Sequence, residues 1–499
     1  MNELPKVLKS RHDADAIERI DVEAVNKTER RQLYKKREPI YPKLVHGRFR
    51  ALKWAVMAIT LGVYYGLPWV RWDRGPGEPS QAVLVDFPGQ RFYFFFIEIW
   101  PNEIYYITGL LIFAALALFL VTSLFGRVWC GYACPQTVWT DLYIAVERLV
   151  EGDRNARMRL AKEGWNAGKI AKRITKHALW LLIAAATGGA WIFYFHDAPT
   201  VFPEIFTGHA PATAYDFLGI LTFTTYALAG TMREQVCTYM CPWPRIQAAL
   251  TDEDALSVTY RRDRGEPRGP HKKGDSWEGR GDCIDCAQCV AACPMGIDIR
   301  DGDQLECINC ALCIDACDSI MKRVGRPLGL IAYDTLKNVT RRSNGEPAVY
   351  RFIRARTILY AIGILVVAGI MLFALAHKRT IDLSVERDRN PAFVRLSDGS
   401  VRNGYTIRIE NRAPRTASFA VKVESKVPYE MKTVGIEPET APLAISLKSG
   451  EDRTLRVYLT LKAKQVAQAA PLPLEVEVIN LSTNEERSEK TTFLTGAQP

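Results

Sequence analysis

The sequence predicts a multidomain membrane protein, and three observations support this fold class. Five long apolar segments predict a polytopic α-helical membrane domain of about five helices. A cysteine-rich stretch between the fourth and fifth segments predicts an inserted α+β module. After residue 380, alternating β-branched patterns separated by turn residues predict a C-terminal immunoglobulin-like β-sandwich. The chain has 499 residues, which suffices for about three or four domains.

The apolar segments set the order of the chain. They cover residues 52–70, 104–125, 177–195, 214–232 and 357–376. Lys and Arg crowd the loop 126–176, whereas the loop 196–213 has none. By the positive-inside rule, the N-terminus and the cysteine-rich module lie inside and the C-terminus lies outside. Residues 92–100 are apolar but too short to span, so we expect an interfacial or re-entrant segment there.

These features divide the chain into five parts. They are a charged cytosolic tail (1–50), a four-helix membrane domain (51–260), a linker with the cysteine-rich module (261–350), a fifth transmembrane helix (351–379) and a periplasmic sandwich (380–499). The net charge of +10 comes from Lys and Arg beside apolar segments. That placement is typical of a membrane protein, so we expect a lipid bilayer and no nucleic acid as partner.

Eight of the twelve cysteines form two runs of C-x2-C-x2-C-x3-C. This is the spacing of bacterial ferredoxins with two 4Fe-4S clusters, in which the fourth cysteine of each run binds the other cluster. We assign to the first cluster Cys283, Cys286, Cys289 and Cys317, and to the second Cys307, Cys310, Cys313 and Cys293. A disulfide framework or zinc knuckles are the alternatives, but zinc sites usually pair C-x2-C units across longer gaps. The module is therefore predicted to be a two-cluster ferredoxin.

The other four cysteines form a second constellation. Cys130 and Cys134 follow the second apolar segment, Cys237 and Cys241 follow the fourth, and both pairs read C-x3-C-P. Cysteines at i and i+4 share a helix face, and a following proline can open a new helix whose N-terminus lowers a thiol pKa. Thiolates select Cu(I), zinc or iron–sulfur clusters, so copper, a third cluster and reversible thiol chemistry stay open. Buried cysteines that only pack are the further alternative.

The chain resembles the FixG/RdxA/CcoG family, accessory proteins of cbb(3)-type cytochrome c oxidase. The resemblance covers the stretch 40–50 before the first helix, both C-x3-C-P motifs, both ferredoxin runs, the fifth helix and the sandwich. The N-terminal part alone also resembles the NapH and NosR membrane ferredoxins, which share C-x3-C-P. The first resemblance implies two 4Fe-4S clusters on the eight ferredoxin cysteines and copper at Cys130, Cys134, Cys237 and Cys241.

The same resemblance implies an oxidoreductase of the bacterial inner (plasma) membrane that reduces Cu(II) to Cu(I). The copper would go to the oxidase through its assembly factors or through a copper chaperone or exporter, and the electron donor is unknown. Two other functions fit the sequence: a quinol-linked electron-transfer subunit of NapH/NosR type that serves a periplasmic partner, or a passive oxidase-assembly scaffold. Stoichiometric copper binding with reduction would distinguish the first function from the other two.

Overall fold

The computed structural model describes residues 19–26, 38–75, 78–271, 274–413, 416–425, 427–435, 443–466 and 472–495. The charged run at residues 30–37 lies outside the described residues. The chain forms two compact units. The first contains Met1–Trp72 and Gln81–Met371, and the second contains Asp73–Ser80 and Leu372–Pro499.

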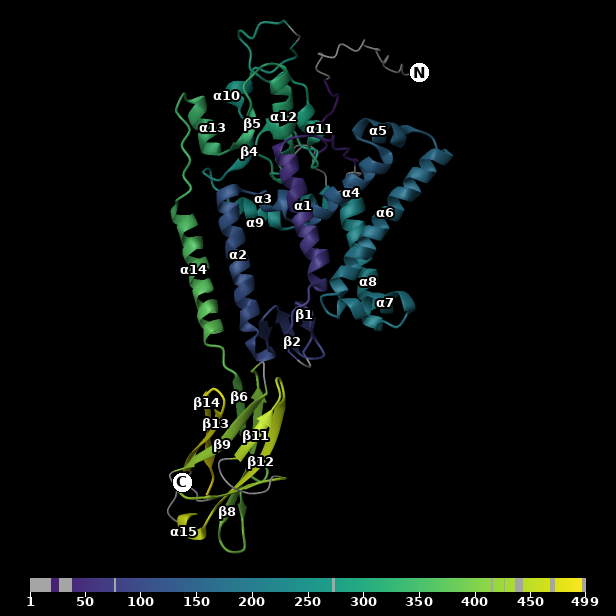
Figure 1. The fold of residues 1–499 in the computed structure, drawn as a ribbon. Coiled ribbons are helices and arrows are strands. Elements are labelled where there is room, and N and C mark those ends of the chain that lie inside the picture. The colour runs from purple at the N-terminus through teal and green to yellow at the C-terminus, as the bar shows by residue number, and fades with distance from the viewer. Residues whose placement is uncertain are drawn as a thin grey trace. The chain divides into compact units, whose positions relative to one another are not determined.

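Long helices dominate the first unit (Figure 1). They are α1 (Arg48–Gly66), α2 (Tyr105–Phe125), α6 (Ala167–Ile192), α8 (Ala212–Thr225) with its π-helical continuation η4 (Tyr226–Met232), and α14 (Ala355–Ala376). All five apolar segments are therefore helical. Among the described residues, however, only α2 and α14 are long and apolar enough to cross a membrane, with mean hydropathy of 2.5 and 2.8.

The prediction of about five membrane-spanning helices is thus not confirmed. The other three helices fail for reasons visible in their sequences. Helix α1 begins with Arg48, Arg50 and Lys53. The first turns of α6 carry several basic residues, and α8 has only 14 residues before the backbone changes to a π-helix.

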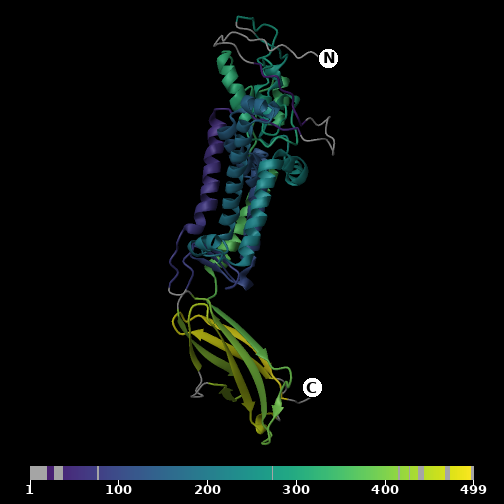
Figure 2. The same cartoon turned by 90° about the vertical axis from the view of Figure 1, so that its right-hand side faces the viewer.

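The two most apolar helices pack against each other. A Cβ added at Gly109 of α2 would lie 2.9 Å from the sulfur of Met371 in α14. The rings of Phe119 and Tyr360 lie 5.9 Å apart between the same helices. Helices α6 and α8 form a second pair, in which Gly188 lets the backbone carbonyl of Leu218 approach closely. Figure 2 shows these helices running alongside one another.

Shorter elements connect the long helices. They are η2 (Leu67–Trp69), η3 (Pro101–Glu103), α3 (Val128–Tyr132), α4 (Pro135–Glu151), α5 (Arg154–Lys162), α7 (Ala198–Thr207), η5 (Val236–Met240) and α9 (Trp243–Leu250). Strands β1 (Val83–Asp86), β2 (Arg91–Phe94) and β3 (Ile97–Ile99) form an antiparallel sheet. The segment 92–100 is thus a β-hairpin, and its predicted interfacial or re-entrant position stays a prediction. The run alternates and pairs as strands, with Tyr93 buried on one face.

The ferredoxin module is inserted between two paired strands. Strand β4 (Ser257–Tyr260) lies antiparallel to β5 (Ile331–Asp334), with Thr259 opposite Ala332. Between and beside them lie α10 (Arg262–Gly265), α11 (Gln288–Ala292), η6 (Ile299–Asp301), α12 (Leu312–Arg323) and α13 (Leu336–Ser343). Buried apolar residues such as Val290, Ile314 and Met321 fill its core.

Part of the expected N-terminal tail packs on this module. The backbone N–H of Ile20 donates to the carbonyl of Cys286 at 3.1 Å, and that of Lys43 donates to Ala291 at 2.8 Å. Val45 joins a buried apolar cluster with Ile308. Described residues on both sides of the charged run therefore contact the ferredoxin module.

The second unit is a β-sandwich, which confirms the immunoglobulin-like prediction. Its described residues form β6 (Ile381–Arg387), β7 (Val394–Arg395), β8 (Val401–Asn411), β9 (Ala417–Ser425), β10 (Glu430–Thr433), β11 (Leu443–Leu447), β12 (Asp452–Leu461), β13 (Leu472–Asn480), β14 (Glu486–Phe493) and the short helix α15 (Ala463–Val466). One sheet has the order β10-β12-β8-β6 with β7 on β8, and the other has β11-β9-β13-β14. Alternate residues such as Ile407 and Phe419 point into the core between them.

Candidate functional site

The structure brings together the first predicted set of ferredoxin cysteines. Burial raises the pKa of the Cys317 thiol well above its ordinary value, and the nearby thiols of Cys289, Cys286 and Cys283 add to this effect. Cys317 on α12 therefore lies beside three cysteines of the other run, as the spacing predicts. Arg300 forms an ion pair with Asp285 of the first run, with an N–O distance of 2.7 Å.

The second set is assembled in the same way. Burial, followed by the neighbouring thiols of Cys310, Cys307 and Cys293, raises the pKa of Cys313 well above its ordinary value. Cys293 thus leaves its own run and joins the second one. Each set contains four cysteines, the number that a 4Fe-4S cluster needs.

The loops of both runs share an unusual backbone geometry. The residues on either side of the second cysteine adopt positive φ in each run: Asp285 and Ala287 at 53° and 52°, and Asn309 and Ala311 at 53° and 60°. Left-handed residues at these positions curl the chain around the space that the cysteines face. Donor set and loop shape both fit two cubane clusters.

We call Cys130, Cys134, Cys237 and Cys241 the C-x3-C-P set, and the structure brings them together. Burial raises the pKa of Cys130 to about 12, with a further contribution from Cys134. The thiols of Cys237 and Cys241 also raise this pKa, whereas Arg127 lowers it. The two motifs are far apart in sequence, so this proximity is a property of the fold.

Two details of the C-x3-C-P prediction need correction. First, the two cysteines of a motif do not share a continuous helix, because α3 ends at Tyr132 and Cys134 is an extended N-cap residue before Pro135. Second, the pKa of Cys134 is raised and not lowered. Burial outweighs the backbone N–H groups of the following helix, which act in the opposite direction.

The C-x3-C-P set lies directly against the second ferredoxin set. Cys130 and Cys237 pack on an apolar cluster that contains Cys310. Gly131 shows how close the backbones are, because a Cβ there would lie 2.6 Å from the carbonyl oxygen of Ile308. Packing density at this boundary leaves no room for a side chain.

Arg127 connects three segments at this boundary. Its guanidinium donates to the carbonyl oxygens of Leu305, Cys307 (3.3 Å) and Pro244 (2.7 Å). It therefore ties the first motif to the second ferredoxin run and to the start of α9, the helix after the second motif. The sequence placed Arg127 near the cysteines but gave no sign of these contacts.

Arg233 holds the second motif. It lies in the left-handed region (φ 47°) just before Cys237 and forms an ion pair with buried Glu147 at 2.7 Å. Glu147 is part of α4, the helix that begins after Cys134. The ion pair thus links the two C-x3-C-P motifs through α4.

Gln247 is a further residue that the sequence did not reveal. The Cys130 thiol donates to its Oε1 at 3.1 Å, and its side chain is fully buried. Its Nε2 lies 3.4 Å from the hydroxyl of Thr122. A buried amide beside a metal-binding thiol can orient that thiol and tune its electron density.

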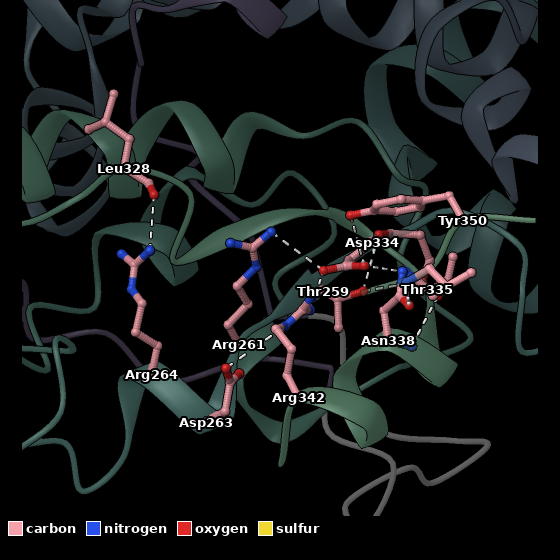
Figure 3. Close-up of polar contacts among 12 residues, drawn as sticks. Thr259, Arg261, Asp263, Arg264, Leu328, Asp334, Thr335, Asn338, Arg342 and Tyr350 are labelled. Carbon is pink, nitrogen blue, oxygen red and sulfur yellow. Dashed lines mark hydrogen bonds and ion pairs between the residues drawn. The ribbon is translucent and has the colours of Figure 1, made fainter. Parts of the chain in front are cut away.

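A polar network holds the segment that leads from the ferredoxin module to α14 (Figure 3). Asp334 is fully buried and accepts from Arg342, from Arg261 at 3.5 Å and from the Tyr350 hydroxyl at 3.4 Å. The network ties strand β5 to helix α13 and the segment after it. These contacts hold the end of the module to α13 independently of the cluster cysteines.

Within the described ranges, no group of three or more histidine, cysteine or carboxylate side chains has the arrangement of a metal-binding site. The three cysteine sets are therefore identified by shared surroundings and spacing. Metal ligation by each cysteine stays a prediction.

Two buried ferredoxin cysteine sets beside apolar helices define an iron–sulfur electron-transfer protein. Comparison with known families supports this class. A 4Fe-4S dicluster domain model matches residues 232–336, a second 4Fe-4S binding domain model matches residues 107–151, and a model of the IG-like fold at the C-terminus of FixG matches residues 371–496.

Curated relatives then identify the family. Protein RdxB of Cereibacter sphaeroides is 50% identical over 471 residues, which are 93% of this chain and 98% of that protein. Nitrogen fixation protein FixG of Rhizobium meliloti is 49% identical over 481 residues, 90% of this chain and 92% of that protein. The chain belongs to the FixG/RdxA family. A crystal structure of a FixG-related protein from Vibrio parahaemolyticus is also similar, with 19% identity, a TM-score of 0.20, and coverage of 24% of this chain and 99% of that one.

Proposed function

We propose that this protein is a membrane-bound cupric reductase that uses the C-x3-C-P set to bind its copper substrate. One observation carries the proposal: Cys130 and Cys237 pack against the apolar cluster that contains Cys310 of the second ferredoxin set. An electron leaving that set reaches the neighbouring thiols without crossing water.

The chemistry of the donor set favours the reduced ion. Soft thiolates bind Cu(I) in preference to harder ions, so the site makes reduction of bound Cu(II) more favourable. The clusters, when bound, supply single electrons. Cu(II) gains one electron and becomes Cu(I), and the iron–sulfur group that gives the electron is oxidised by one.

The membrane arrangement is part of the proposal. The protein crosses the bacterial inner membrane several times, with the N-terminus and ferredoxin module in the cytoplasm and the sandwich in the periplasm. The support is the Lys and Arg excess in the loop 126–176 and its absence from the loop 196–213. Cu(I) would pass to a copper chaperone, an exporter or assembly factors of a cbb(3)-type oxidase.

A second candidate is an electron-transfer subunit that holds a third 4Fe-4S cluster on the same four cysteines. The observation that favours it is the match of a 4Fe-4S binding domain model to residues 107–151, which include Cys130 and Cys134. In this alternative, electrons would continue to a partner outside, and copper would play no part.

Metal analysis of purified variants separates the two functions. Cys130→Ser and Cys237→Ser should each lower copper binding and Cu(II) reduction, and the double variant should lose little more, because members of one site are not additive. Iron content should stay the same as in the unaltered protein. Loss of about four iron with no change in copper would establish the third cluster instead.

A further inference from the structure

We infer that the copper site opens to the surface at Cys241, and that Met240 is a transient ligand through which Cu(I) leaves. This inference rests on the proposed function. It assigns separate faces of the C-x3-C-P set to electrons and to the metal ion, and it names a soft ligand outside the four cysteines.

The two copies of the motif face different surroundings. In the first copy Tyr132 is buried and its hydroxyl donates to the carbonyl oxygen of Cys310 at 3.2 Å. In the second copy the equivalent Tyr239 is 46% exposed. The tyrosine of the first copy thus faces the ferredoxin module, whereas the tyrosine of the second copy is exposed.

The thiols show the same asymmetry. Cys241 is exposed, whereas the other three cysteines of the set are partly buried. On the opposite side, the Cys130 thiol contacts Gln247, whose side chain is fully buried. Of the four thiols, Cys241 is therefore the one at which an ion held by the set meets an external acceptor most directly.

A pocket lies at this open side. It has a volume of about 290 Å³, and its lining includes Cys237, Met240, Cys241, Arg245 and Glu306. The Met240 side chain is 55% exposed. The equivalent position of the first copy is Ala133, so only the second copy, which contains the exposed Cys241, has a thioether at this position.

Met240 suits the departure of Cu(I) for a chemical reason. Thioether and thiolate sulfur both select Cu(I), and a thioether needs no deprotonation to bind. Met240 can therefore hold the ion while one cysteine bond breaks and a bond to the acceptor forms. No electron moves in this exchange: a Cu(I)–S bond to the site is replaced by one to an acceptor thiolate, the acceptor thiol releases its proton, and the vacated cysteine takes one up. The partner is thus a Cu(I) carrier with an accessible thiol.

The test measures release of Cu(I) from the full-length protein in detergent. Protein loaded with Cu(I) is mixed with the soluble Cu(I) chelator bathocuproine disulfonate, and colour development gives the rate. Met240→Leu, which keeps the size and removes the sulfur, should slow release by about tenfold. Met240→Ala, which copies the residue of the first motif, should do the same. Tyr239→Phe, in the same pocket lining, is the matched control and should release copper at the unaltered rate.

The outcomes are distinguishable from those of the proposed function. Copper content, iron content and Cu(II) reduction should be unchanged in both Met240 variants, which also shows that they fold. If the variants bind and reduce copper but release it as fast as the unaltered protein, Met240 only contacts lipid and the inference is wrong. If the unaltered protein binds no copper, the proposed function fails and the inference fails with it.

Discussion

Glu147 is the residue whose removal should destabilise the first unit most directly. Its side chain is only 5% exposed and binds Arg157, Arg233 at 2.7 Å and Lys176 at 3.6 Å. Glu147→Leu leaves Arg157 and Arg233 without this ion-pair partner, whereas Lys176 keeps its ion pair with Glu151 at 3.0 Å. Removing one partner of a buried ion pair costs about 3–5 kcal/mol, because the remaining charge is buried without compensation.

The matched control is Glu346→Leu. Glu346 forms an ion pair with Arg341 at 3.3 Å, but its side chain is 52% exposed, and exposed pairs contribute about 0–1 kcal/mol. Denaturant unfolding in detergent, followed by tryptophan fluorescence, gives both values. All tryptophans lie in the first unit, so the signal reports on that unit alone.

Equal small losses in the two variants would refute the reasoning, since they would show that the network around Glu147 is solvated. A large loss in Glu147→Leu should also lower copper binding, because Arg233 would no longer be held beside Cys237. Normal copper binding in a strongly destabilised variant would show that the second motif is positioned by other contacts.

Three further predictions concern pH, iron and topology. Burial opposes ionisation of Glu147, but Arg233, Arg157 and Lys176 outweigh this effect and lower its pKa below the ordinary 4.5. The stabilisation by Glu147 is therefore complete above pH 4.5 and is lost as the pH falls through the lowered pKa. The unfolding free energy, measured against pH, should decline in that range, and the decline should be weaker in Glu147→Gln. Purified protein should contain about eight iron, Cys289→Ser should impair one cluster more than the other, and four iron in a well-loaded sample would exclude two clusters. Alkaline phosphatase fused after residue 380 should be active and fused near residue 270 inactive, and the reverse pattern would overturn the proposed orientation.

Local patterns carried most of what the sequence could predict. The ferredoxin spacing predicted that the fourth cysteine of each run lies beside the other run. This could be predicted because each loop and the short helix after it are formed by residues that are adjacent in sequence. The sandwich followed from alternation, since strands such as β8 and β9 bury every second residue around Ile407 and Phe419. The same C-x3-C-P spacing after the second and the fourth apolar segment indicated one shared constellation, and the structure brings the four cysteines together.

Contacts between distant segments could not be predicted. Gln247 meets Cys130 across more than a hundred residues, and nothing in the short helix α9 distinguishes it from a surface glutamine. Residues 19–26 contact the ferredoxin module through backbone hydrogen bonds and through single side chains such as Arg19 and Asn26, and so short a polar stretch carries no periodic pattern. Apolar composition predicted five membrane-spanning helices, of which α2 and α14 meet the length and hydropathy of a span; basic residues at the start of α1 and α6 and the end of α8 at Thr225 leave the other three unconfirmed.

The pairing of β4 with β5 makes the ferredoxin module a cassette. Its first and last strands are hydrogen-bonded neighbours, so the helices before and after it are joined as if by a hairpin turn. Closing such a long excursion costs little entropy, and domains whose ends meet are the ones that insert readily into other proteins. Exchanging residues 261–330 for another redox domain with adjacent ends would keep the connection from α9 to α13, but the new domain would have to replace contacts such as that of Arg127 with Cys307. In such variants, redox domains of different reduction potential would take the place of the ferredoxin module beside the C-x3-C-P set.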